Sequence, residues 1–459
     1  HKTSSAASDV YKRQYKYRCY PNLIQKINLA KLFGCTRVVW NDGLAYCIQE
    51  FKSTKKKPTN SELQKVFITQ AKKTIERSWL TEISVVPLQQ SLNDLHQAYQ
   101  NFFNSATGKR KGMKIKSPKF KKRKSKQTAR FTKIGFKLSQ DKVYLAKIGK
   151  IKVAWSRPLP IEPTSVTIIK DSANRYFLSF VIETSAETLP KTDNSIGIDL
   201  GISTFATLNN GQKFEAPKPL KKNLKKLAKF QRQLAQKIPG SKRREKAKLR
   251  VAKLHAKITD IRTDFLHQLS TKLIREYDTI VLEDLNVSGM VKNRKLAKAI
   301  SDLGWRMFRT LLETKCQKYG REFRVINRWE PTSQKCSHCG FRGGKKELNV
   351  REWNCLKCGT HHDRDVNAAV NILEVVQLRT KVEVIETKVL ESPVQLSLFN
   401  IVADGQSETE QKRALSKGKT CRKKPANCDE MLTRFESFKQ LNLFDCCLLY
   451  TSPSPRDET

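Results

Sequence analysis

Acidic side chains are scarce in this sequence relative to basic ones, and the imbalance limits the partners that the chain can have. Among 459 residues there are 43 Asp and Glu against 89 Lys and Arg, which gives a formal net charge of +46. Such an excess of positive charge repels itself unless a polyanion neutralises it. The composition therefore predicts a nucleic-acid partner.

Long apolar runs are also missing. No run approaches the roughly 18 residues that a membrane span needs, and the first residues lack the charged-then-apolar plan of a signal peptide. We therefore expect no membrane contact and a cytoplasmic, nucleoid-associated protein. The GKT at residues 418–420 lacks the first glycine of a P-loop, because Arg413 stands in its place. ATP use is not indicated.

Both ends of the sequence resemble translated sequencing-adapter DNA. The stretch HKTSSAASDVYKRQ opens the chain, and CLLYTSPSPRDET closes it. We expect residues 1–14 and 446–459 to be artefacts of this kind and leave them out of the predicted fold.

The first half of the remaining chain changes from helical to strand-like periodicity. Residues 15–50 start like a strand and continue at helical spacing that Gly34 interrupts, which is typical of a helix-turn-helix. Within residues 51–130, residues 61–104 keep helical periods and predict a small helical domain, and a basic segment follows. Within residues 131–190, residues 143–184 alternate like strands and predict a β-barrel or a β-sandwich.

Two stretches concentrate the positive charge. Residues 109–130 hold 12 basic side chains and no acidic one, and residues 218–257 hold 16 basic side chains against Glu245 alone. The first stretch could be a solvated loop, although like-charge blocks are often interaction segments. The second predicts two long antiparallel helices with a positive flank. The basic residues that we expect to bind nucleic acid are Lys109, Arg110, Lys111, Lys121, Lys122, Arg123, Lys221, Lys222, Lys225, Arg243 and Arg244.

Three carboxylates stand where a metal could bind them. Asp199 lies between two glycines in SIGIDLGIS, where a strand would leave open space around it, although a surface strand can also carry a lone Asp. Glu283 interrupts the apolar strand DTIVLEDLNV, and a buried carboxylate needs a strong partner. Asp363 and Asp365 precede an apolar helix face, so Asp363 suits the N-cap and Asp365 the first turn. Carboxylates that meet require cations, and Mg²⁺ or Mn²⁺ suits oxygen ligands.

Four cysteines form two pairs with metal-binding spacing. Cys336 and Cys339 stand in CSHCG, and Cys355 and Cys358 stand in CLKCG. The glycine after each pair permits the positive φ of a tight turn around one ion. The pattern predicts a structural Zn²⁺ site.

These motifs together resemble a known family. With Asp199 in GIDLG, Glu283 in VLEDL and the paired cysteines followed by DRDVNAAVNIL, residues 15–373 resemble TnpB, the transposon-associated RNA-guided nuclease that is related to type V CRISPR effectors. The resemblance implies a multidomain α+β fold. Residues 15–190 would form a wedge β-barrel with a helical recognition insertion at 51–130. An RNase H-like (RuvC) α/β nuclease domain would follow at 191–330 and 361–375, with a zinc ribbon inserted at 331–360.

The same resemblance implies an activity. Asp199, Glu283 and Asp365 match the family's catalytic triad of a two-metal nuclease, which leaves Asp363 as the helix cap. Guide RNA, held by the basic stretches, would select a double-stranded DNA target beside a short adjacent motif. Two alternatives remain open: a catalytically silent nucleic-acid-binding regulator, and a junction resolvase, against which the cysteine insertion and the long basic half argue.

The tail at residues 376–445 is polar, and we expect it to be disordered. It contains VQLSLFN at 394–400 and KQLNLFD at 439–445, which share the pattern Gln-Leu-x-Leu-Phe. This pentapeptide resembles the motif that binds the bacterial sliding clamp, but it could also anchor the tail on the protein's own surface. The expected clamp contacts are Gln395, Leu398, Phe399, Gln440, Leu443 and Phe444.

Overall fold

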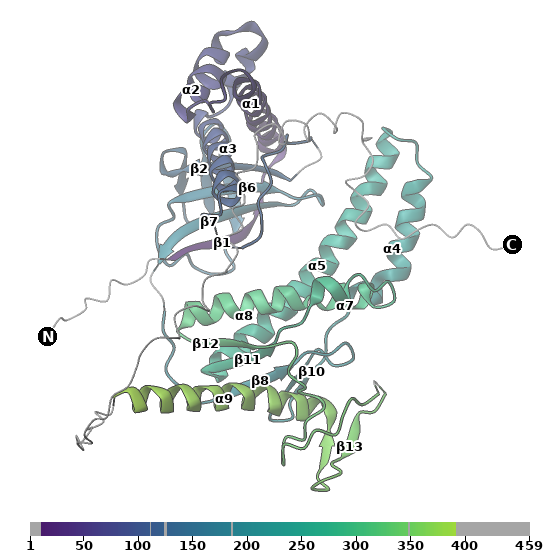
Figure 1. Ribbon diagram of the computed structural model, residues 1–459. Coiled ribbons are helices and arrows are strands. Elements are labelled where there is room, and N and C mark those ends of the chain that lie inside the picture. Colours follow the sequence, from purple (N-terminus) through teal and green to yellow (C-terminus); the bar gives the residue numbers. More distant parts are fainter. Residues whose placement is uncertain (1–10, 111, 124–125, 185–186, 348, 392–459) are drawn as a thin grey trace, which may run out of the picture. The chain divides into compact units, whose positions relative to one another are not determined.

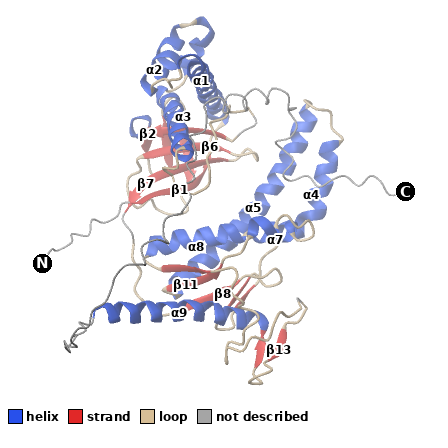
Figure 2. Cartoon of the chain, in the orientation of Figure 1, coloured by secondary structure: helices blue, strands red, loops and turns tan. Residues whose placement is uncertain are grey.

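The computed structural model describes residues 11–391, apart from 111, 124–125, 185–186 and 348, and it describes side chains from Lys12 to Leu378. Figure 1 shows the order of the elements and Figure 2 their type. The first half comprises β1 (Tyr11–Tyr20), α1 (Leu23–Thr54), α2 (Asn60–Gln64), η1 (Lys65–Gln70), η2 (Ala71–Lys73), η3 (Ile75–Glu82), α3 (Val85–Ala106), β2 (Gln127–Thr132), η4 (Lys133–Gly135), β3 (Phe136–Leu138), β4 (Lys142–Leu145), β5 (Gly149–Ala154), β6 (Ser165–Lys170) and β7 (Tyr176–Thr184).

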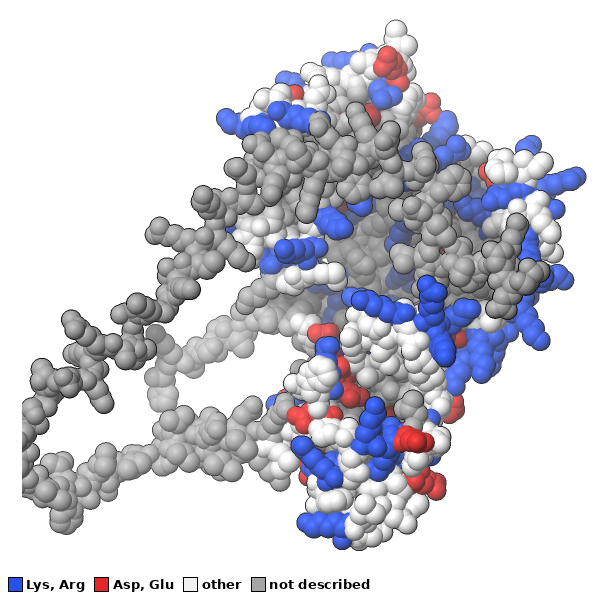
Figure 3. All heavy atoms as spheres, turned by 45° about the vertical axis from the view of Figure 1, so that its right-hand side comes forward, with Lys and Arg blue, Asp and Glu red and all other residues white. Residues whose placement is uncertain are grey.

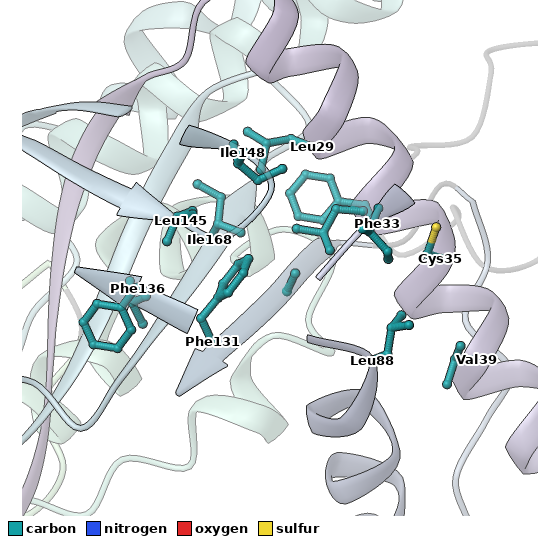
Figure 4. Close-up of a cluster of buried hydrophobic side chains, with 14 of the residues drawn as sticks. Leu29, Phe33, Cys35, Val39, Leu88, Phe131, Phe136, Leu145, Ile148 and Ile168 are labelled. Carbon is teal, nitrogen blue, oxygen red and sulfur yellow. The ribbon is translucent and has the colours of Figure 1, made fainter. Parts of the chain in front are cut away.

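These strands form one open antiparallel sheet of seven strands in the order β2-β6-β7-β1-β5-β4-β3. The predicted barrel is wrong, because the edge strands β2 and β3 do not pair in the described chain. Closure is not needed to bury the apolar side of the sheet, since α1 and α3 contribute to the same core. Leu29 and Phe33 of α1 lie with Phe131 and Ile168 of the strands in this core (Figure 4).

β1 begins at Tyr11, which pairs with Thr184 of β7. Residues 11–14, which we left out of the predicted fold, are therefore part of the sheet. Asn22 follows the strand and closes a capping box with Gln25, whose backbone N–H donates to the Asn22 side chain at 2.8 Å.

α1 is a single helix of 32 residues, and Gly34 does not break it. The predicted helix-turn-helix break is wrong for an energetic reason. One glycine inside a helix costs about 1 kcal/mol relative to alanine. The side chains that α1 buries, among them Leu29, Leu32 and Phe33, contribute more than this when they leave water.

The basic segment after α3 is attached to α1 over part of its length. The indole N–H of Trp40 donates to the carbonyl of Lys119 at 3.1 Å, and the Asn41 amide exchanges two hydrogen bonds with the backbone of Lys121. The Lys121 ammonium lies 3.6 Å from the centre of the Trp40 ring. Burial lowers the pKa of Lys121 to about 8, although nearby Asp94 opposes the shift.

The second half is built on a sheet with a different topology. Its elements are β8 (Ser195–Asp199), β9 (Ala206–Leu208), β10 (Lys213–Phe214), α4 (Pro219–Ala235), α5 (Lys242–Glu276), β11 (Thr279–Glu283), α6 (Val287–Met290), α7 (Ala297–Leu303), α8 (Trp305–Tyr319), β12 (Glu322–Ile326), β13 (Glu352–Asn354), β14 (His361–Asp363) and α9 (Arg364–Glu391). Five strands pair in the order β10-β9-β8-β11-β12, with β8, β11 and β12 parallel and β9 antiparallel to β8.

Helices cover both faces of this sheet (Figure 1). Ile196 and Ile198 of β8 share a core with residues of α5 and α8, such as Leu269 and Phe308. On the other face Val281 of β11 packs against α9. The predicted open space beside Asp199 is wrong at Gly197, where a Cβ would lie 2.2 Å from the carbonyl oxygen of Ala369. Glycine at this position lets the backbone of α9 approach the sheet.

α4 and α5 are the two long helices that the second basic stretch predicts, and they pack through Leu227, Leu254 and Ile258. The buried carboxylate of Asp302 accepts the N–H groups of Leu220 and Lys221 at 3.0 Å each and fixes the start of α4.

α9 continues to Glu391, so the first part of the predicted disordered tail is helical. Its buried positions extend past the last predicted motif at 361–375, since Val376 is buried in the same cluster as Val281 and Ile326.

Candidate nuclease and metal sites

Two of the predicted carboxylates lie at the carboxyl ends of neighbouring strands. Asp199 ends β8 and Glu283 ends β11, and the two strands pair in parallel with Leu282 opposite Ile198. From β8 the chain continues to β9 and β10 on one side, whereas β12 lies beyond β11 on the other. Such a reversal of strand order is the usual position of a binding site in an open α/β sheet.

The third carboxylate comes from α9. Asp363 accepts the backbone N–H groups of Asp365 and Val366 at 2.9 and 3.0 Å, which confirms it as the helix cap. Lys213 lies 2.6 Å from the other oxygen of Asp363. Burial would raise the pKa of Asp363, but Lys213 and the cap hydrogen bonds lower it below its usual value. Asp363 is thus occupied with contacts inside the protein.

The other two predicted carboxylates lie near enough to Asp199 to affect its ionisation. Burial raises the pKa of Asp199 to about 7, with further increases from Glu283 and Asp365, against the effects of Arg364 and the Leu200 N–H. Burial also raises the pKa of Glu283. In the described chain neither Asp199 nor Glu283 has an ion-pair partner within 4.0 Å. Oxygen donors with unbalanced charge fit a hard divalent cation, although the three are not gathered within the 4.8 Å that the cysteines described below reach.

Asp284, the neighbour of Glu283, has a separate task. Arg309 donates to it at 2.6 Å and the Nε of Arg328 donates at 3.1 Å. These arginines lower the pKa of Asp284. Asp284 therefore connects β11 to α8 and to the loop after β12, whereas the described residues include no ion-pair partner for Glu283.

The four predicted metal ligands come together. The sulfur atoms of Cys336, Cys339, Cys355 and Cys358 all lie within 4.8 Å of one another. Cys336 and Cys358 are 3.7 Å apart and Cys339 and Cys355 are 3.6 Å apart, close to the roughly 3.8 Å between sulfurs bound 2.3 Å from a tetrahedral ion. Gly340 and Gly359 have φ of 73° and 71°, as the tight turns require. The cluster fits one metal ion.

A buried histidine lies directly behind this cluster. His362 is 8% exposed, and its Nε2 is 3.0 Å from the sulfur of Cys336. The ring centres of Trp353 and His362 are 4.8 Å apart, and the Lys346 ammonium is 3.5 Å from the centre of the Trp353 ring. His362 is not among the four ligands and instead contacts one of them, as partners of metal ligands commonly do.

Sequence reasoning missed the residues that join the cysteine segment to the carboxylates. Asn367 and Asn371, one turn apart on α9, both donate to the carbonyl of Lys335 at 2.8 Å. Arg364 donates to the carbonyl of Glu347 at 2.7 Å, and Arg351 reaches Asp365. The two asparagines of DVNAAVN, spaced to lie on one helix face, could have indicated a polar contact of α9. No local pattern distinguishes the two arginines from other surface arginines.

The predicted nucleic-acid residues divide into free and engaged side chains. Lys and Arg side chains gather over α4 and α5 (Figure 3), where Lys221, Lys222, Lys225 and Arg243 are exposed. Arg244 instead donates to the carbonyls of Leu234 and Lys237 at 3.0 and 2.6 Å and holds the turn between the helices.

The basic segment after α3 shows the same division. Lys109, Arg110 and Arg123 are exposed, whereas the ammonium of Lys121 lies on Trp40. Lys111 and the clamp-motif residues Gln395, Leu398, Phe399, Gln440, Leu443 and Phe444 lie outside the described residues. Among the helices described, none is long and apolar enough to span a membrane.

Three family models match the chain. The model described as "Probable transposase" matches residues 179–294, "Cas12f1-like, TNB domain" matches 305–372, and "Helix-turn-helix domain" matches 11–56, the span of β1 and α1. The second match covers the four cysteines and all of β14.

Curated relatives cover most of the chain. A Streptomyces pristinaespiralis protein named "Putative RNA-guided DNA endonuclease" is 45% identical over 366 residues, 79% of this chain and 89% of the relative. An Escherichia coli K12 protein with the same description, InsQ, is 31% identical over 378 residues, 78% of this chain and 91% of the relative. A solved "Cas12f1-sgRNA-target DNA complex" aligns with a TM-score of 0.48 at 14% identity, over 79% of this chain and 98% of that one.

Proposed function

The chain belongs to the OrfB (TnpB) family of transposon proteins, and from this premise we propose that it is an RNA-guided, metal-dependent DNA endonuclease. The observation that supports the proposal is that Asp199 and Glu283 end neighbouring parallel strands at the switch point of the second sheet, where Glu283 and Asp365 raise the pKa of Asp199. A regulator without catalysis would have no need to place two further carboxylates where they raise the pKa of Asp199.

In this proposal Asp199, Glu283 and Asp365 hold Mg²⁺ or Mn²⁺, and the sheet with α9 is a RuvC-like nuclease domain of RNase H type. When bound, two such ions would activate water and stabilise the leaving oxygen in phosphodiester hydrolysis. Glu283 and Asp199 stay available for metal because Arg309 and Arg328 pair with Asp284 instead.

The cysteine cluster is assigned to structural Zn²⁺, because four thiolates complete a tetrahedral site and leave no open position for chemistry. It forms a ribbon between β12 and α9. By its hydrogen bonds to α9, the ribbon positions the helix that carries Asp365.

Guide RNA and double-stranded DNA are the proposed partners. The exposed basic side chains of α4 and α5 and of the segment after α3 supply phosphate contacts, and the net charge of +46 is compensated by nucleic acid. Lys121 and Arg244 are better assigned to holding these elements in place.

The test begins with sequencing the RNA that copurifies with the full-length protein. Duplex DNA that matches the guide portion, placed beside a randomised flank, is then incubated with the complex and Mg²⁺. Cleavage that depends on RNA, matching sequence and metal is expected. Bound RNA without cleavage under any flank would favour the silent regulator, and an RNA-independent cut at four-way junctions would favour a resolvase.

A finer proposal concerns the two Gln-Leu-x-Leu-Phe segments, which would bind the sliding clamp and bring the nuclease to replicating, nucleoid-associated DNA. Two motifs on one tail could engage two clamp subunits and increase avidity. The test is a pull-down of purified clamp by the full-length chain. The variant that combines Leu398→Ala, Phe399→Ala, Leu443→Ala and Phe444→Ala should lose binding, and equal binding by variant and wild type, or none by either, would refute the idea.

A further inference from the structure

One cationic side chain of the ribbon reaches a carboxylate of the proposed nuclease site. Arg351 lies between the two cysteine pairs, yet its Nη1 is 3.4 Å from the Oδ1 of Asp365 and its Nη2 is 3.3 Å from the hydroxyl of Ser203. Ser203 belongs to the loop that follows Asp199. A single guanidinium thus connects the ribbon, the first turn of α9 and the loop after β8.

The backbone of Arg351 is held by a shorter hydrogen bond than its side chain is. The carbonyl of Arg351 accepts the N–H of Arg364 at 2.7 Å, and the Arg364 guanidinium donates to the carbonyls of Glu347 and Val350 at 2.7 and 3.5 Å. The Arg351 side chain is 54% exposed and that of Asp365 is 20% exposed. The hydrogen-bonded backbone therefore keeps Arg351 beside Asp365, while the exposed guanidinium can change its partner.

The contact itself is weak. Ion pairs open to water contribute little to stability, and 3.4 Å is long for a hydrogen bond between charged groups. A guanidinium has five N–H donors in a planar fork, and only two nitrogens are engaged here. Arg351 can exchange Asp365 for another oxygen anion at small cost, and a phosphate diester matches the fork as well as a carboxylate does.

We propose that Arg351 is a displaceable cation of the nuclease site: it screens Asp365 before a divalent metal binds, and it then contacts a phosphate of the bound DNA. This inference rests on the proposed nuclease function. It places one positive charge beside a half-buried group of like charges in the metal-free state, and it gives the ribbon a direct role at the reacting strand. Arg351 and the metal therefore compete for Asp365. Once DNA is bound, the metal supports hydrolysis while Arg351 holds a phosphate.

The first test measures metal binding without activity. Full-length protein freed of nucleic acid is titrated with Mn²⁺, and free Mn²⁺ is followed by electron paramagnetic resonance, with Asp199→Ala as the blank for this site. Arg351→Ala should bind Mn²⁺ about two- to five-fold more tightly than wild type, the size expected from losing an exposed ion pair. Arg351→Lys keeps the charge and should bind as wild type does. Mn²⁺ binding by Arg351→Ala that is no tighter than wild type overturns the proposal.

The second test measures cleavage of guide-matched duplex in single turnover at saturating Mn²⁺. Arg351→Ala should be slower by about 100-fold, the usual effect of removing one positioned donor, and Arg351→Lys should recover part of the rate because it lacks the planar fork. Arg342→Ala is the matched control: it removes an exposed arginine of the same ribbon for which the described structure records no ion pair. Equal rates for Arg351→Ala and wild type overturn the proposal. If wild type itself fails to cleave, the nuclease assignment fails, and the Mn²⁺ titration alone decides the role of Arg351.

Discussion

The backbone N–H of Asp365 donates to the carboxylate of Asp363 at 2.9 Å. Two aspartates separated by one residue therefore have different tasks: Asp363 ends β14, starts α9 and pairs with Lys213, while Asp365 contributes to the field at Asp199. The difference can be measured.

Asp199→Ala, Glu283→Ala and Asp365→Ala should each abolish Mg²⁺-dependent cleavage and leave RNA binding near normal, because each removes a proposed metal ligand and no proposed phosphate contact. Asp363→Ala should still cut DNA, and its free energy of unfolding should fall by about 0.5–2 kcal/mol through loss of the cap. Cleavage gels and chemical denaturation check both. Full cleavage by Asp365→Ala together with loss in Asp363→Ala would show that the roles are reversed.

Metal affinity should depend on pH near neutrality. Because burial and two neighbouring carboxylates raise the pKa of Asp199 to about 7, a proton competes with metal below that pH. Mn²⁺ affinity should fall by up to about ten-fold per pH unit below 7 and level off above it. The pKa in the folded chain exceeds the value of about 3.9 for an unfolded Asp. Through this group the metal-free fold therefore loses stability as the pH rises from about 4 to 7. Asp199→Asn cannot titrate, and a wild-type affinity that is flat from pH 6 to 8 would contradict the prediction.

Cys336→Ser and Cys358→Ser should both lower bound zinc and the melting temperature, since a structural zinc site contributes to folding directly. Metal analysis of purified protein checks this. Cys47→Ala, which removes a buried free thiol elsewhere, is the control that should keep its zinc. His362→Phe retains all four ligands but loses the contact with Cys336, so it should start with full zinc and release it faster to a chelator. Wild-type protein without zinc would refute the assignment.

Two glycine-to-alanine changes should act in opposite directions. At Gly197 the added methyl would lie 2.2 Å from the Ala369 carbonyl, so α9 must move and the melting temperature should drop. At Gly34 nothing lies within 4 Å, and the helix should gain about 0.5–1 kcal/mol. Thermal denaturation of the two variants beside wild type decides the matter. A neutral Gly197→Ala would mean that α9 does not approach β8 closely in solution.

Features that depend on short patterns could be predicted from the sequence. The glycines after Cys339 and Cys358 indicate the tight turns around a metal, and Asp363 precedes an apolar helix face at the position of a cap. Asp199 ends a strand whose alternating isoleucines are buried as predicted. Each of these conclusions needs only neighbours in sequence.

Features that depend on packing between distant segments could not be predicted. Gly34 has the same local signature as a helix break, and only the side chains buried on both sides of it show that the helix continues. From the sequence alone, Gly197 predicts open space beside Asp199. In the structure, the backbone of Ala369, which is far away in the sequence, occupies this space. The first sheet can stay open because α1 and α3 cover its apolar side. The periodicity of the strands gives no information about this helix packing.

The side chain of Asn367 also accepts the N–H of Ser337, beside Cys336, at 2.9 Å, so the first cysteine turn is attached to the same helix turn that presents Asp365. If both proposed metal sites are filled, a chelating agent would remove two sets of ions, and the two losses would differ in how easily they are reversed. When only the metal at the carboxylates is removed, cleavage should return as soon as Mg²⁺ is added back. Prolonged chelation that also empties the cysteine cluster would loosen the start of α9, and cutting would then return only after zinc is restored and the ribbon has refolded. Recovery of cleavage with Mg²⁺ alone would thus show that only the proposed catalytic metal was lost. Recovery that also needs Zn²⁺ would show that the fold around the start of α9 was lost as well.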